Sequence, residues 1–145
     1  MYPQLMSGSD AVVFLDFDGT ITGRDATDAI LEAFADPAWL TVEEAWVSGR
    51  IGSRECLAAQ TALVRATPDQ IDRLLDGIEI DPGFSTLLDA CATRAVPVHI
   101  LSDGFDYCIE RILAQPGLRL RERLTGAHIV SSRLRPDAGR WRAAF

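Results

Sequence analysis

The chain has 145 residues, of which 48% are hydrophobic, and this composition predicts a packed domain and excludes a disordered chain. Its net charge of −7 argues against a nucleic-acid partner, which would need a clustered positive surface. No apolar run approaches the ~20 residues of a membrane span, so we expect no membrane association.

The first predicted strand is Ala11–Leu15, an apolar run typical of a parallel strand buried on both faces. The segment before it, MYPQLMSGSD, lacks a basic start and a long apolar run, so we expect no signal peptide. A helical pattern then extends from Asp25 to Gly77, and its last helix begins at a capping box of Thr67 and Gln70. The helices predicted in this region are 25–35, 40–47, 53–64 and 67–77.

The second half of the chain predicts a helix at 85–94, a buried strand at Val96–Leu101, a helix at 105–113 and a hairpin arm at 127–135. This order is typical of a doubly wound α/β fold with a parallel sheet. We therefore expect an α/β core of residues 1–23 and 79–145, with a small helical cap of residues 24–78 inserted after the first strand.

Two carboxylates follow the first strand directly. Because strand side chains alternate, Asp16 and Asp18 are expected on one side and Phe17 in the core. Two close carboxylates stay ionised only if a cation or hydrogen bonds compensate them, and Mg²⁺ prefers such oxygen ligands. Ser102 is the first polar residue after the second strand, so it should face the same crevice. Gly19 would permit a tight turn after the aspartates, and the hydroxyl of Thr20 is expected to pin this loop. The alternative for a bare Asp-x-Asp is a solvated turn.

The segment DFDGTIT at 16–22 resembles the first motif of the haloacid dehalogenase superfamily, and ILSDGF at 100–105 resembles its second. The helical insert is similar to the cap of the phosphoserine-phosphatase-like subgroup. IDPGF at 80–84 and SDGFDYCIERIL at 102–113 are similar to the branch that contains the methionine-salvage keto-methylthiopentenyl phosphate phosphatase. The resemblance implies a Mg²⁺-dependent phosphomonoester hydrolase that acts on a small phosphorylated metabolite.

The resemblance also implies roles for individual residues. Asp16 would be the nucleophile that becomes an aspartyl-phosphate, and it would bind Mg²⁺. Asp18 would be the acid and base, with its backbone carbonyl on the metal. The phosphate-binding residues would be Thr20, Ser102, Asp103 and Gly104, where the amides of 103 and 104 open a helix.

Several residues of the insert have open assignments. Asp25 and Arg54 are candidates for substrate contacts, although surface helix positions are the alternative. Trp39 and Trp46 are expected to form one packed helix face, and Glu43 is expected to be solvated. Glu44, the next residue, is also expected to be solvated.

The chain departs from the superfamily pattern after the second motif. All 14 basic residues are arginines, so the lysine of motif three is absent, and no acidic pair follows a later strand as motif four requires. Arg133 or Arg135 would be a non-conservative substitute for that lysine. The sheet would then be truncated at its C-terminal side, with an exposed edge open to self-association or a complementing chain.

Three explanations of this departure stay open: a fragment of a longer phosphatase, a chain complemented by a second one, or a degenerate member that binds phosphorylated ligands without turnover. Phosphoryl transfer between substrates would use the same aspartate pair. The three cysteines Cys56, Cys91 and Cys108 form no CxxC pair, and we expect reduced core thiols, which indicate a cytoplasmic setting.

Overall fold

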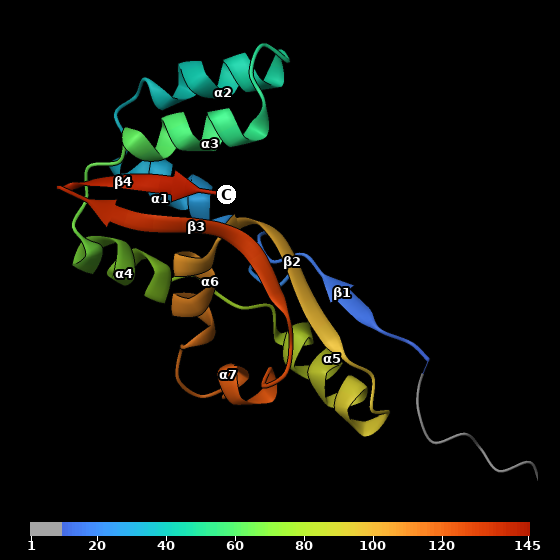
Figure 1. Ribbon diagram of the computed structural model, residues 1–145. Helices are drawn as coiled ribbons and strands as arrows, with labels where there is room; N and C mark the ends of the chain where they lie inside the picture. Colours follow the sequence, from blue (N-terminus) through green and yellow to red (C-terminus); the bar gives the residue numbers. More distant parts are fainter. Residues whose placement is uncertain (1–9) are drawn as a thin grey trace, which may run out of the picture.

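The computed structural model describes residues 10–145, in which groups of helices separate the strands β1, β2 and β3 (Figure 1). The expected absence of a signal peptide and the first nine residues of the expected α/β core concern residues 1–9, which lie outside the described residues. The elements in chain order are β1 (Val13–Leu15), α1 (Ala26–Phe34), α2 (Trp39–Val47), α3 (Ser53–Ala62), α4 (Pro68–Asp76), α5 (Pro82–Thr93), β2 (Val98–Phe105), α6 (Asp106–Leu113), α7 (Leu120–Arg123), β3 (Ile129–Asp137) and β4 (Arg140–Ala144).

The strands form a four-stranded sheet in the order β1-β2-β3-β4. β1 is parallel to β2 and β2 is parallel to β3, whereas β3 and β4 form an antiparallel hairpin. The parallel pairing needs long crossovers, and the helices α1 to α5 supply the first of them. The predicted α/β fold with a mainly parallel sheet is therefore confirmed.

The helices between β1 and β2 occupy two positions. The α2–α3 pair packs together and stands apart from the strands β1 and β2, whereas α1 and α4 pack toward the rest of the molecule (Figure 1). The predicted capping box at the start of α4 is confirmed: Thr67 accepts the amide of Gln70, and the Gln70 side chain accepts the amide of Thr67. Pro68 follows the cap, where its missing N–H leaves no hydrogen bond unmade.

The β3–β4 hairpin joins the helical pair to the sheet. β4 packs against α3, and the indole Nε1 of Trp141 donates to the carbonyl of Ala66 at 2.9 Å. The Trp141 ring also meets Tyr107 edge to face, with 5.1 Å between the centroids. Because Trp141 is buried and its N–H is satisfied, it holds the hairpin against the segment that leads into α4.

One face of the parallel strands is not covered by the described residues, contrary to the expected burial of both faces. Ile100 of β2 is fully buried, but its neighbour Leu101 is 46% exposed, and Phe14 and Val130 are 57% and 58% exposed. The strand register places Leu101 opposite Val130, on one face with Phe14. The physical reason is that α5, α6 and α7 all lie on the other side of these strands (Figure 1).

The three cysteines are free and buried, as predicted for core thiols. Among residues 10–145, we find no helix with the length and apolar character that crossing a bilayer requires.

Candidate active site

The two aspartates after β1 both line a cavity of about 320 Å³. Phe17, between them, is completely buried, so the chain alternates here as a strand does even though β1 ends at Leu15. Asp16 is exposed, and its Oδ1 accepts the amide of Phe17 at 2.7 Å. Asp18 is partly buried, and its Oδ1 accepts the amide of Ala26, at the start of α1, at 2.7 Å. The helix N-terminus thus fixes one oxygen of Asp18.

The loop after the aspartates is held by a threonine other than the one expected. Thr20 is exposed and does not line the cavity, so the expected pinning of the loop by its hydroxyl is wrong. Thr22 is buried instead: its Oγ1 donates to the carbonyl of Arg24 at 2.8 Å and accepts the amide of Gly19 at 3.3 Å. Gly19 has φ of +72°, which explains the glycine at this turn.

The second predicted motif also lines the cavity, through Ser102, Asp103 and Gly104. These residues belong to the end of β2, and α6 begins only at Asp106, so the expectation that the amides of 103 and 104 open a helix is wrong. The pairing of β2 with β3 is irregular between Leu101 and Phe105, which turns this segment away from regular strand geometry. The hydroxyl of Ser102 accepts the amide of Gly104 at 3.0 Å.

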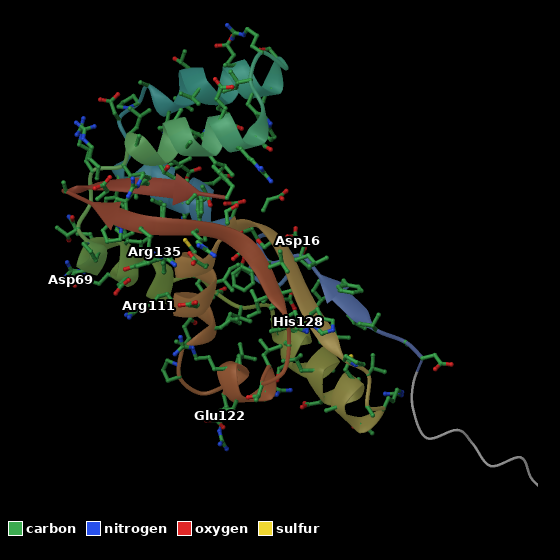
Figure 2. All side chains as sticks on the ribbon, viewed as in Figure 1. Asp16, Asp69, Arg111, Glu122, His128 and Arg135 are labelled. Carbon is green, nitrogen blue, oxygen red and sulfur yellow. The ribbon has the colours of Figure 1, made fainter. Side chains whose placement is uncertain are left out.

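Gly104 lies directly against the first motif. A Cβ atom on Gly104 would be 2.3 Å from Oδ2 of Asp18 and 3.1 Å from Oγ of Ser102, distances at which side chains must move. Glycine is therefore required here by close approach and not by an unusual φ. The structure thus brings Asp16, Asp18, Ser102, Asp103 and Gly104 together, at the ends of the adjacent parallel strands β1 and β2. Figure 2 labels Asp16 at this end of β1.

The substrate candidates in the insert are separated by the structure. Asp25 lines the cavity and also caps α1, where its carboxylate accepts the amide of Asp28 at 2.9 Å. Arg54 is exposed, does not line the cavity, and lies with its guanidinium carbon 5.8 Å from the centroid of the Phe145 ring. Arg135, considered as a lysine substitute, makes a bidentate ion pair with Asp106, with Nη2 at 2.7 Å from Oδ2.

The far wall of the cavity comes from α1, α2 and α3 and includes residues that sequence reasoning missed. Glu43 was expected to be solvated, but it is half-buried and lines the cavity with Gln60. Trp46 was expected on a packed face, but it is 44% exposed at the cavity wall, whereas Trp39 packs against the core. No local signal identifies these residues, because their position depends on how α2 and α3 pack on each other.

Six carboxylates line the cavity, and none of the described residues lining it is basic. Burial raises the pKa of Asp18 from 3.8 to about 6, the amide of Ala26 opposes this, and the nearby charges of Asp25, Asp16 and Asp28 add to it. Burial and the charges of Asp25, Glu43 and Glu32 likewise raise the pKa of Asp28. The six are Asp16, Asp18, Asp25, Asp28, Glu43 and Asp103.

The raised pKa of Asp18 predicts that the native chain and Asp18→Asn differ in stability by an amount that depends on pH. Because its pKa is higher in the folded chain than in the unfolded one, its contribution to stability is present below the unfolded value and is lost as the pH rises through about 6. In chelator-treated samples, Asp18→Asn should therefore melt at a higher temperature than the native chain at about pH 7.5, and the difference should shrink toward about pH 4. Differential scanning calorimetry across this range measures it.

The matched control for this experiment is Asp69→Asn, at an exposed position in the first turn of α4. A melting difference for Asp18→Asn that does not change with pH would show that the carboxylate is not destabilised by its surroundings.

The fold and the cavity define an α/β protein with paired aspartates at the end of one parallel strand and a serine at the end of the next. The chain belongs to the haloacid dehalogenase-like hydrolase family, whose model matches residues 13–143. It is thus an enzyme by lineage.

Curated relatives include several phosphatases. The chain is 35% identical over 105 residues to the 2-hydroxy-3-keto-5-methylthiopentenyl-1-phosphate phosphatase of Brevibacillus brevis, a match that covers 71% of this chain and 47% of the relative. The protein of the same name from Geobacillus thermodenitrificans is 32% identical over 115 residues, which cover 78% of this chain and 51% of the relative. The chain therefore spans about half the length of the curated relatives it matches.

Solved structures agree on the fold. A HAD family hydrolase from Salmonella enterica superposes with a TM-score of 0.75 at 16% identity, covering 98% of this chain and 47% of that one. The phosphoserine phosphatase of T. onnurineus superposes with a TM-score of 0.67 at 18% identity, covering 98% of this chain and 65% of that one. At such identities the likeness concerns the fold alone.

Proposed function

We propose that this chain carries the reactive aspartates of a Mg²⁺-dependent phosphatase that hydrolyses a small phosphorylated metabolite. The observation that carries the proposal is the convergence of Asp16, Asp18 and Ser102 on one cavity at the ends of adjacent parallel strands. The names of the curated relatives, which are phosphatases of a phosphorylated methylthiopentenyl compound, support a small phosphorylated substrate.

In the proposed reaction, a carboxylate oxygen of Asp16 attacks phosphorus, and the bond from phosphorus to the leaving oxygen breaks. Asp18 donates its proton to that oxygen, and the phosphoryl group stays on Asp16 as an aspartyl-phosphate. Asp18 then accepts a proton from water as the water oxygen attacks phosphorus. The bond between phosphorus and the Asp16 oxygen breaks, which releases inorganic phosphate and restores the Asp16 carboxylate. The pKa of Asp18, raised to about 6, suits a group that must first donate and then accept a proton near neutral pH.

The remaining donors would bind the phosphoryl oxygens. The hydroxyl of Ser102 lines the cavity on the side of β2, beside the backbone of Asp103 and Gly104. Thr20 lies outside this lining, so its assignment to the phosphate rests on the motif alone.

The residues fit a partial magnesium site. Among residues 10–145, no group of three or more His, Cys, Asp or Glu side chains is arranged to hold a metal. Mg²⁺ nevertheless binds commonly through one or two carboxylates and keeps several waters, and the carboxylate of Asp16 and the backbone carbonyl of Asp18 would be its ligands here. The ion would neutralise charge on the phosphoryl oxygens, which the acidic lining does not do.

Release of inorganic phosphate from an aryl phosphate, with added Mg²⁺ and with chelator, tests the function. We expect release that requires Mg²⁺ and stops in chelator. Release that is equal in both conditions would contradict the metal dependence, and no release in either would contradict hydrolysis by this chain.

A second candidate is a non-catalytic module that binds a phosphorylated ligand or a complementing chain. The observations that favour it are the lack of a basic residue in the described cavity lining and the uncovered apolar face beside the edge strand β1. Such a module would bind its ligand without releasing phosphate. Calorimetric titration with Mg²⁺ would distinguish the two candidates, because a module that binds no metal shows no heat and an enzyme that binds Mg²⁺ does.

The remaining assignments are proposals as well. We propose that residues 24–78 act as a cap over the core, since α1, α2 and α3 supply the far wall of the cavity. We propose a cytoplasmic location, which the three free cysteines support. An exposed sheet edge at β1 would be the contact for self-association or for a complementing chain.

A further inference from the structure

Glu43 is held in a defined position on the cavity wall. The side-chain amide of Gln60, on α3, donates from Nε2 to Oε2 of Glu43, on α2, at 2.7 Å. Gln60 is only 2% exposed, so its amide is fixed by the packing of the two helices. The thiol of Cys56, also on α3, lies 4.0 Å from the same oxygen. Both contacts involve Oε2, so they limit the orientation of the Glu43 carboxylate while Oε1 keeps acceptor capacity for a ligand.

An aromatic ring lies beside this carboxylate along the helix. Trp46 follows Glu43 by three residues on α2, so the two side chains project from the same face of the helix, and both line the cavity. A carboxylate next to an accessible indole face is a combination that attracts organic cations, through charge and through the ring quadrupole. A neutral leaving group would gain neither the charge attraction to Glu43 nor the attraction to the Trp46 ring.

The charge of the cavity favours the same kind of ligand. The phosphate end has Ser102 and the proposed Mg²⁺ to balance an anion, but no described basic residue lines the wall where Glu43 and Asp28 lie. Glu43 and Asp28 line the same cavity, and the charge of Glu43 helps to raise the pKa of Asp28, which Arg24, outside the cavity lining, opposes. A positive group on the substrate would relieve this repulsion, and no group of the cavity lining does so.

We propose that Glu43, oriented by Gln60 and flanked by Trp46, selects phosphomonoesters whose leaving group carries an ammonium group. This inference rests on the proposed function, because it takes the phosphoryl group to lie beside Asp16 and Ser102. It assigns Glu43 to specificity and leaves the bond-breaking step to the aspartates after β1.

The test compares two phosphonates that cannot be hydrolysed, aminopropylphosphonate and butylphosphonate, in which a methyl group replaces the ammonium group at equal chain length. Isothermal titration of the whole chain in Mg²⁺ should show tighter binding of aminopropylphosphonate. In Glu43→Gln, which keeps an acceptor for Gln60, its affinity should fall about fivefold, and the affinity for butylphosphonate should stay the same or rise.

The control is Glu44→Gln, which removes the same charge from the next position of α2 but from a side chain outside the cavity lining. It should leave both affinities unchanged. Equal affinities of the two phosphonates for the native chain, equal losses in the two variants, or no binding of either phosphonate would overturn the assignment. Because phosphonates bind without turnover, a chain that fails to release phosphate can still confirm or refute it.

Discussion

Asp16→Asn is expected to reduce Mg²⁺-dependent phosphate release by about a thousandfold or more, because an amide cannot replace the carboxylate as nucleophile. The asparagine side chain has nearly the same shape, and its oxygen can still accept the amide of Phe17, which Asp16 accepts at 2.7 Å. Since Asp16 is exposed, its replacement opens no cavity in the core. The variant should therefore fold normally and lose only its chemistry.

The measurement is the initial rate of phosphate release from an aryl phosphate, alongside the melting temperature of each protein. Asp69→Asn is a matched control, because it makes the same exchange at an exposed position on α4, well away from Asp16 (Figure 2). Similar rates for Asp16→Asn and the native chain would remove Asp16 from the role of nucleophile.

Gly104→Ala is expected to lower the rate of phosphate release by about a hundredfold or more, since general acid–base catalysis contributes on this scale. The added methyl group would lie 2.3 Å from Oδ2 of Asp18. The Asp18 carboxylate has little freedom to retreat, because the amide of Ala26 holds its other oxygen at 2.7 Å. Either the carboxylate or the end of β2 must shift, and both bear groups assigned to the reaction.

The matched control is Gly52→Ala, where an added Cβ meets no atom within 4 Å and the backbone angle of −83° is ordinary. It should keep the native rate, apart from a small loss of helix stability at the start of α3. If Gly104→Ala keeps the native rate of phosphate release and the native melting temperature, the close approach of Asp18 to Gly104 is not needed for catalysis.

The parts of the site that sequence reasoning located are those encoded within short segments. Asp16, Phe17 and Asp18 follow a strand whose side chains alternate, so their opposite directions follow from local geometry. Ser102 follows the predicted strand Val96–Leu101 and lies in the last part of β2, and parallel pairing alone brings the ends of β1 and β2 to one edge. The capping box at Thr67 is equally local, which explains its correct prediction.

The expectations that failed depend on contacts between distant segments. Thr22 replaces Thr20 as the buried loop hydroxyl, because Thr22 turns into the core and Thr20 into solvent. Glu43 lies at the cavity because α2 packs on α3, where the side-chain amide of Gln60 donates a hydrogen bond to its carboxylate. An apolar run at Phe14 predicts burial, but burial depends on whether an element covers that face of the sheet.

The sequence by itself determined the order of elements from β1 to α6, the family to which the chain belongs, and the paired aspartates with their serine, because backbone alternation and strand ends are properties of a few adjacent residues. Only the tertiary structure decided which side chains form the far wall of the cavity, which face of the sheet is bare, and how strongly burial raises the pKa of Asp18. Those features depend on solvent exclusion and on charges from separate elements, and both exist only after packing.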